Sequence, residues 1–264
     1  MSNIPPIPPP VPPQIPAPMP IASGHSPLGE NPDERAPISG VIGAVEAILR
    51  QPRRVMFQLR QPGPGRLIGA MLFVSILCSL VYGVVVGTFS MGDQLWAAPV
   101  KIAGGLLVSA LICLPSLYIF TCLSGSQARL AEIFGLVTGL LMLMTILLIG
   151  FAPVAWLFSQ STESITWMGT LHLVFWFIAT FFGLRFLEAG FSHSQARSRA
   201  GLNTWIIIFM LVVVQMTTAL RPILGKAPTF FPQKKMFFLD HWGACLKAPS
   251  AAEQDSARHD KVRD

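Results

Sequence analysis

Five long runs of apolar residues alternate with short polar segments along most of the chain. The runs cover about 67–89, 100–123, 133–157, 167–187 and 204–224. Each is long enough for a helix that crosses the hydrocarbon core of a bilayer, which takes about 20 residues. The pattern therefore predicts an all-α fold, a polytopic transmembrane bundle of about five spans across residues 67–224.

A shorter pattern precedes the first run, in residues 38–66. Ser39 is a suitable N-cap, and apolar residues from Val41 to Leu49 recur at helical spacing. Pro52 is expected to end this helix. We expect an amphipathic helix on the membrane surface, followed by a basic elbow that contacts anionic lipid head groups. The arginines expected to make these contacts are Arg50, Arg53, Arg54, Arg60 and Arg66.

Neither end of the chain has a pattern of regular structure. Residues 1–37 contain thirteen prolines and are expected to form a disordered proline-rich tail, either simply solvated or carrying a PxxP ligand for a partner domain. The start lacks the basic and apolar regions of a signal peptide, so the first span is expected to direct insertion. Residues 225–248 mix aromatic residues with lysines, as in an interfacial segment, and 249–264 form a mobile polar tail.

Composition favours a membrane protein over a soluble one. The 264 residues are 52% hydrophobic and 12% charged, whereas soluble domains carry about 25% charged residues. The net charge of +6 fits basic loops beside anionic lipid. No segment is long enough to form a soluble basic domain, so nucleic acid is not an expected partner.

The positions of Lys and Arg predict the orientation. Five arginines precede the first run, whereas Lys101 is the basic residue expected in the loop after it. Because cytoplasmic loops are richer in Lys and Arg, we expect a cytoplasmic N-terminus. Compact loops and the lack of a signal peptide favour a bacterial inner membrane, and a eukaryotic endomembrane stays open as the alternative. The basic residues that follow the fifth run count against this orientation and leave the side of the C-terminal tail open: Arg221, Lys226, Lys234 and Lys235.

Pairs of small residues four positions apart predict where the helices pack. In a membrane, Gly, Ala and Ser let helix backbones approach closely. The pairs in the first four runs are Gly83 and Gly87, Gly105 and Ser109, Gly135 and Gly139, and Ala179 and Gly183. The fifth run has no such pair and is expected at the edge of the bundle. The same small-residue faces suit a homo-oligomer or a protein partner.

The stretch QMTTALRPILG places polar residues at the end of the fifth run. Gln215, Thr218 and Arg221 are three residues apart and share one side of a helix. A glutamine amide within hydrocarbon needs a hydrogen-bond partner. Two interpretations stay open. The stripe either joins this helix to the bundle, or it lines a pocket for a lipid head group or a small anion.

Other polar chemistry is sparse. His172 lies inside the fourth run without a carboxylate at similar depth, and we expect it to hydrogen-bond to a neighbouring helix. Charged residues in hydrocarbon mark pumps and ion-coupled carriers, and the runs offer no charge-lined path. The chain has no catalytic motif and no metal-ligand spacing among its four cysteines. We therefore expect no enzyme activity, no cofactor and no metal.

The layout of residues 40–224 resembles the Yip1-like family of polytopic membrane proteins. The resemblance rests on the segment ILRQPRRVMFQL, Ile48 to Leu59, between a disordered N-terminal region and five membrane helices. It implies a cytoplasmic N-terminal region and a role in membrane trafficking or scaffolding. The segment 225–248 is not part of that pattern. We predict a non-enzymatic subunit or scaffold of a membrane complex. The alternative is a small permease or lipid-handling protein that uses the polar stripe.

Overall fold

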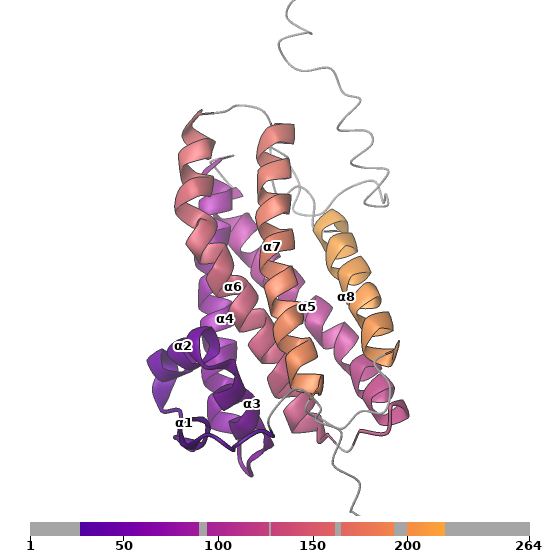
Figure 1. Ribbon diagram of the computed structural model, residues 1–264. Coiled ribbons are helices and arrows are strands. Elements are labelled where there is room, and N and C mark those ends of the chain that lie inside the picture. Colours follow the sequence, from indigo (N-terminus) through magenta and orange to yellow (C-terminus); the bar gives the residue numbers. More distant parts are fainter. Residues whose placement is uncertain (1–26, 90–93, 127, 162–164, 193–199, 220–264) are drawn as a thin grey trace, which may run out of the picture.

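The computed structural model describes residues 27–89, 94–126, 128–161, 165–192 and 200–219, and its regular structure there is helical (Figure 1). Four of the helices are long and apolar enough to cross a membrane: α4 (Gly65–Thr88), α5 (Gln94–Leu123), α6 (Leu130–Ser161) and α7 (Ile165–Ser192). The predicted all-helical fold with membrane-length helices is confirmed. The fifth predicted span falls on α8 (Ala200–Ala219), whose apolar stretch in the described residues, Ala200–Met216, is shorter than those four helices.

The main contacts among the long helices link them in the order α7, α6, α4, α5, α8. Helix α6 packs against both α4 and α7, α4 also packs against α5, and α5 against α8 (Figure 1). Helix α6 is therefore the most buried of the four long helices. It carries fully buried Leu140, Met142 and Met144. The central helix of a bundle is the one with apolar side chains buried on most of its surface, so α6 forms the core of this bundle.

Helix α8 lies at the edge of the bundle, as predicted. Trp205 and Phe209 are fully buried and stack with their ring centroids 5.0 Å apart. The Trp205 indole Nε1 donates a hydrogen bond of 2.8 Å to the carbonyl of Cys113 on α5. Ile207 and Leu211, on the other side of α8, are exposed. One side of α8 therefore contacts α5 while the other faces the surroundings of the bundle.

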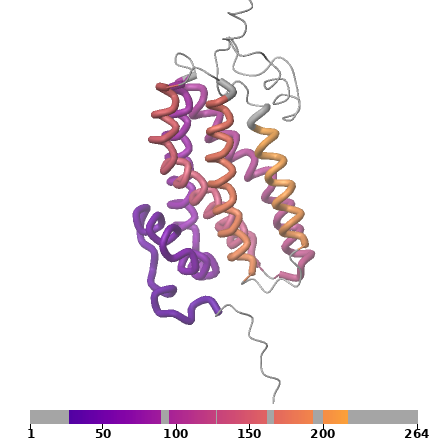
Figure 2. The backbone as a smooth tube through the Cα atoms, turned by 45° about the horizontal axis from the view of Figure 1, so that its top comes forward, coloured from indigo at the N-terminus to yellow at the C-terminus, as the bar shows by residue number. Residues whose placement is uncertain are grey.

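Three short helices form a cap on one end of the bundle: α1 (Pro32–Arg35), α2 (Gly40–Arg50) and α3 (Pro52–Arg60). Figure 2 shows this cap, in indigo, beside one end of the long helices. Gln51 separates α2 from α3 with a non-helical backbone (φ −136°, ψ 60°), and Pro52 opens α3. Proline suits the first turn of a helix because its missing N–H would be unpaired there.

The cap corrects two expectations from the sequence. The segment after Pro52, predicted as a basic elbow, is a helix as far as Arg60. Residues 27–37, placed in the disordered tail, contain α1 and contact α3. Both differences have one cause, because these segments are held by contacts with distant parts of the chain that no local pattern reveals.

The cap packs into the bundle through apolar side chains. Ile48 of α2 and Leu59 of α3 are almost fully buried. A β-carbon added at Gly139 of α6 would lie 3.5 Å from Ile48 Cδ1, and one added at Gly135 would overlap Leu59 Cδ2. The two glycines of α6 therefore make room for the cap. We call this end of the bundle the cap end and the other the opposite end.

The remaining predicted packing residues lie at or near helix contacts. A β-carbon at Gly83 of α4 would overlap the Cα atom of Pro99 on α5, and one at Gly183 of α7 would lie 3.2 Å from the carbonyl oxygen of Leu140 on α6. The other predicted positions are all buried: Gly87, Gly105, Ser109 and Ala179. Small residues such as Gly, Ala and Ser allow the backbones of membrane helices to approach closely.

Candidate functional site

A tyrosine and a histidine meet between α4 and α7 near the opposite end of the bundle. The Tyr82 hydroxyl lies 2.7 Å from Nδ1 of His172, and the two rings are T-shaped with centroids 5.7 Å apart. Tyr82 is only 5% exposed. The predicted hydrogen bond from His172 to a neighbouring helix is therefore confirmed.

The second nitrogen of His172 is buried and has no hydrogen-bond partner among the residues that the structure describes. When the Tyr82 hydroxyl donates to Nδ1, the imidazole hydrogen lies on Nε2 and lacks an acceptor. An unsatisfied polar atom in such a place costs about 1–3 kcal/mol. His172 is therefore a costly residue for stability alone, and this makes it a candidate for function.

Lys101 lies inside α5, which corrects its predicted place in a loop. It is 2% exposed and comes seven residues after Gln94, where α5 begins. The segment Leu95–Val100 is apolar enough to extend the helix beyond the predicted start of the second run. A cation within a membrane-length helix also corrects the expectation that the spans carry no such charge. Ionisable residues at these positions are rare and usually functional.

These three side chains occupy a common level of the bundle. Tyr82 comes six residues before the end of α4, and Lys101 and His172 each come seven residues after the start of their helices. At 1.5 Å per residue, each lies about 10 Å from the helix terminus at the opposite end. We name Tyr82, Lys101 and His172 the polar layer.

The predicted polar stripe is described only in part. Gln215 is half-buried on α8, and the backbone of Thr218 continues that helix. The side chain of Thr218 and all of Arg221 lie outside the described residues. Because α8 begins beside the cap end of α5, Gln215 lies in the same half of the bundle as the polar layer. The proposed pocket stays a prediction.

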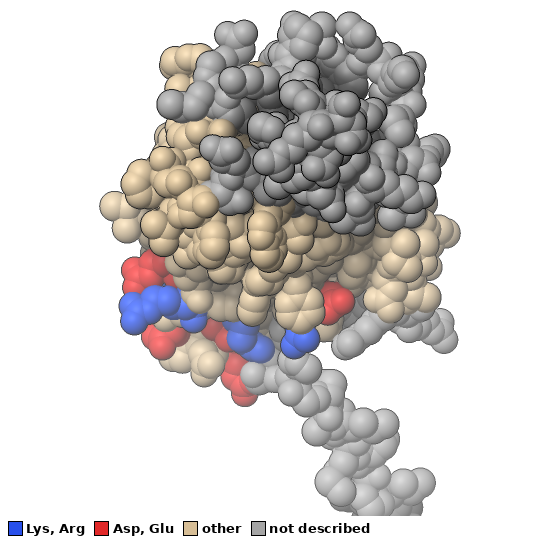
Figure 3. Space-filling model, turned by 90° about the horizontal axis from the view of Figure 1, so that it is seen from above, with Lys and Arg blue, Asp and Glu red and all other residues tan. Residues whose placement is uncertain are grey.

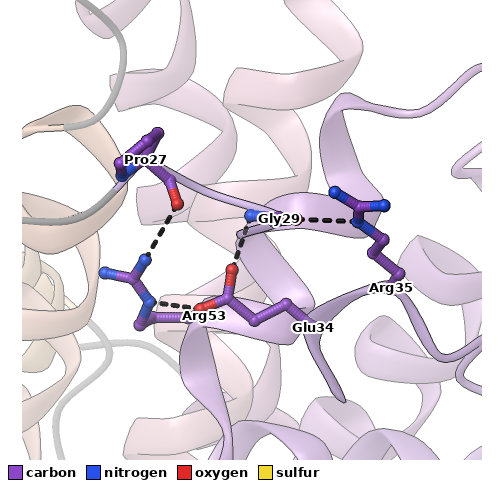
Figure 4. Close-up of polar contacts among 5 residues, drawn as sticks. All are labelled: Pro27, Gly29, Glu34, Arg35 and Arg53. Carbon is purple, nitrogen blue, oxygen red and sulfur yellow. Dashed lines mark hydrogen bonds and ion pairs between the residues drawn. The ribbon is translucent and has the colours of Figure 1, made fainter. Parts of the chain in front are cut away.

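The cap end carries a different kind of polar site, built on Glu34 (Figure 4). Glu34 is 6% exposed, and its Oε1 lies 2.6 Å from Nε of Arg53 on α3. Its Oε2 accepts a hydrogen bond of 2.5 Å from the backbone N–H of Gly29. Arg53 also donates to the carbonyl of Pro27, at 3.3 Å. One buried carboxylate thus holds the segment before α1 against α3.

Further side chains of α3 bind the same segment. Arg54 donates to the carbonyls of Ala36 and Pro37, at 2.9 and 3.0 Å. Gln58 accepts a hydrogen bond of 3.0 Å from the N–H of Ile38 and donates to the carbonyl of Ala36. Residues 27–38 have no helix or sheet to satisfy most of their backbone groups, so α3 supplies side-chain partners in their place.

An ion pair connects the cap to the core helix. Nε of Arg60 on α3 lies 2.8 Å from Oε1 of Glu132 in the first turn of α6. A carboxylate is favourable at that position because a helix N-terminus carries partial positive charge. The pair therefore links α3 to the helix that most of the bundle contacts.

The five arginines predicted to contact lipid fall into two groups. Arg53, Arg54 and Arg60 bind protein groups, whereas Arg50 and Arg66 are exposed. Arg50 forms an ion pair of 3.2 Å with Glu46, one turn earlier on α2. In Figure 3 the charged side chains of the described residues gather along one side of the molecule. Contact with lipid head groups remains a prediction.

The part of the chain that the structure describes contains no group of three His, Cys, Asp or Glu side chains that could hold a metal ion. Cys78, Cys113 and Cys122 are free thiols. The described residues thus offer two polar sites, the cap network of Glu34, Arg53, Arg54 and Gln58 and the polar layer.

Comparison with family models, with curated proteins and with solved structures finds no match. The resemblance to the Yip1-like family accordingly stays a prediction.

Proposed function

We propose that this protein is a non-enzymatic multi-pass membrane protein that acts as a subunit or scaffold of a membrane complex. The bundle anchors it in the bilayer, in a bacterial inner membrane. The cap end faces the cytoplasm and presents the N-terminal segment to a protein partner.

The observation that carries this proposal is the way the cap is fixed to the bundle. Glu34 and Arg53 hold the start of the described chain on α3, and Arg60 and Glu132 hold α3 on α6. Leu59 adds buried apolar contact at the same place. A flexible anchor would not require such an arrangement. A platform that holds a binding segment at a defined place beside the membrane would require it, because pre-organisation lowers the entropic cost of association.

Affinity purification of the full chain in mild detergent, followed by mass spectrometry, tests the proposal. The matched variant lacks residues 2–26 and keeps the cap. We expect the full chain to retain a stoichiometric protein partner, which the shortened chain loses while it inserts normally. Recovery of the full chain without any protein partner, or an unchanged partner after the deletion, would overturn the proposal.

The polar layer favours a second candidate, a small permease or lipid-handling protein. Buried Lys101 and the unsatisfied Nε2 of His172 are costly in a bundle that only serves as an anchor. Gln215 lies in the same half of the bundle and belongs to the predicted polar stripe, which also favours this function. In this interpretation the polar layer receives a lipid head group or a small anion.

Two substitutions separate the candidates. Lys101→Met and Gln215→Leu each replace a polar side chain with an apolar one of similar size. If the protein handles a polar ligand, folded variants lose the co-purifying lipid or the flux across vesicles, while any protein partner remains bound. If it is a scaffold, both variants keep the partner and no ligand-dependent activity changes.

A further inference from the structure

Helix α2 has an apolar surface that the bundle does not cover. Ala44, Ala47 and Ile48 face the bundle and are buried. Ile42, on the other side of the helix, is 84% exposed, and Leu49 is exposed as well. An isolated exposed isoleucine needs no explanation, but an exposed apolar surface on a short helix does.

The exposed surface of α2 divides into an apolar part and a charged part. With about 100° between successive residues, Leu49, Val45 and Val41 lie roughly 20°, 60° and 100° to one side of Ile42. Glu46 and Arg50 lie about 40° and 80° to the other side, and they form the exposed ion pair. Val41 is exposed and Val45 is half-buried. Such a division is typical of a helix that lies at a boundary between hydrocarbon and water.

The depth of α2 in the bundle is set by its contact with α6. Ile48 meets Gly139, which lies seven residues beyond Glu132 and therefore about 10 Å further along α6 than the Arg60 ion pair. The same Gly139 meets Phe186 of α7, with 2.6 Å between a β-carbon placed on the glycine and the Phe186 ring.

This depth coincides with a change in the surface of α7. Phe181 and Phe182 are exposed aromatic residues, and Arg185 follows them with its guanidinium 5.7 Å from the Phe181 ring centroid. A change from exposed aromatic residues to a cation marks the membrane interface. Since Phe186 and Ile48 meet the same glycine, α2 lies at this interface level.

The apolar surface of α2 also lies at a depth similar to that of an exposed aromatic residue on α4. Helix α2 packs against α4, on which Phe73 is exposed. Phe73 lies eight residues, or about 12 Å, from the start of α4 at the cap end, which is close to the depth of Gly139. The exposed apolar surfaces of α2 and α4 therefore occur at similar depths.

We propose that α2 is an interfacial helix whose exposed apolar residues insert among the lipids of the cap-end leaflet. Val41, Ile42 and Leu49 contact acyl chains, and Arg50 lies at the head groups. This rests on the membrane location of the bundle and is independent of whether the protein acts as a scaffold. The sequence predicts that five arginines contact the membrane. In this proposal apolar side chains make most of that contact instead.

Nitroxide labels at single cysteines test the proposal in the full chain. The variants are Ile42→Cys and Leu49→Cys, with Glu46→Cys as the control on the charged part and Ala47→Cys on the buried face. They are made after replacement of Cys122 and Cys245 by Ala, and the same chain without an added cysteine gives the background from Cys78 and Cys113. Each is reconstituted in vesicles of phosphatidylcholine and phosphatidylglycerol. Collisions with oxygen, which concentrates in hydrocarbon, are compared with collisions with a water-soluble nickel chelate.

We expect labels at positions 42 and 49 to collide more with oxygen than with nickel, and the label at 46 to show the reverse. Preferential nickel collisions at 42 and 49 would place this surface in water and overturn the proposal. Suppressed collisions with both reagents, as at 47, would mean that protein covers it, from a second copy or another chain, and would overturn it too. Protease resistance of residues 27–60 shows that each labelled variant keeps its cap folded.

Discussion

The two ends of the bundle treat polar groups in opposite ways. At the cap end, Glu34 and Arg53 form a pair, and each also binds backbone groups. At the opposite end, Tyr82 satisfies one nitrogen of His172, and the other nitrogen has no partner within the described part of the chain. The cap end therefore uses polar contacts for assembly, whereas the polar layer tolerates an unsatisfied atom.

Helix packing explains part of this difference. The cap is built from short helices and an irregular segment, whose free backbone groups require partners. At the opposite end, regular helices satisfy their own backbones, and Gly83 lets α4 touch the backbone of Pro99. Close packing of backbones thus contributes at the opposite end, whereas side-chain hydrogen bonds and ion pairs hold the cap.

The largest effect is expected from Glu34→Ala at the cap end. The substitution removes the Glu34 carboxylate from the partly exposed Arg53 guanidinium and from the buried Gly29 N–H, and each donor that loses its acceptor costs about 1–3 kcal/mol. We expect residues 27–38 to lose protection from hydrogen exchange while the long helices keep theirs. Glu46→Ala, which removes the exposed pair with Arg50, should cost less than about 1 kcal/mol. Equal protection in the two variants would show that the cap does not depend on Glu34.

The next largest effect is expected from Gly83→Ala at the opposite end. The new β-carbon would overlap the backbone of Pro99, which cannot move as a flexible side chain can. Overpacking of this kind costs about 1–3 kcal/mol. Gly69→Ala on the same helix is the control, because nothing lies within 4 Å of its β-carbon position, and it should be neutral or slightly stabilising. Unfolding in detergent measures both. Equal stability would mean that α4 and α5 are not closely packed there.

The sequence predicts the long helices well because bilayer thickness fixes the length of an apolar run. It fails where the run is interrupted by residues that look like a boundary. The sequence predicts that the second span begins near residue 100, yet α5 begins at Gln94. Hydropathy alone cannot tell a buried charge within a helix from a charge in a loop, and this is why the sequence predicts Lys101 in a loop.

The cap illustrates the other limit of local patterns. High proline content placed residues 27–37 in a tail, but Glu34 binds Arg53, nineteen residues away along the chain. The small-residue pairs indicated positions for close contact without naming the contacting element. Gly139 receives a side chain from the cap as well as one from α7. Partners distant in sequence are set by the fold as a whole.

A smaller effect is expected from a double-mutant cycle on Tyr82 and His172. Tyr82→Phe leaves Nδ1 of His172 unsatisfied and should cost about 1–2 kcal/mol. His172→Phe leaves the Tyr82 hydroxyl unsatisfied but also removes the buried Nε2, so it should cost less. The double variant removes every polar atom of the pair, and its loss should be smaller than the sum of the two single losses. Unfolding in detergent gives the four stabilities. Additive losses would show that each residue has its own contacts and that the two do not form an isolated pair.

The smallest effect is expected from salt, and it should act on one end only. The Arg60–Glu132 pair is partly exposed, and screening shortens from about 10 Å at 0.1 M to about 3 Å at 1 M ionic strength. Raising salt across this range should weaken docking of the cap by less than about 1 kcal/mol, measured as faster hydrogen exchange in residues 52–60. Arg60→Gln should abolish most of that dependence, because it removes the cation that pairs with Glu132. Exchange near Tyr82 should not change, since its contacts involve no ion pair. A similar salt effect at both ends would contradict this comparison, because it would show that ion pairs contribute equally to the cap and to the polar layer.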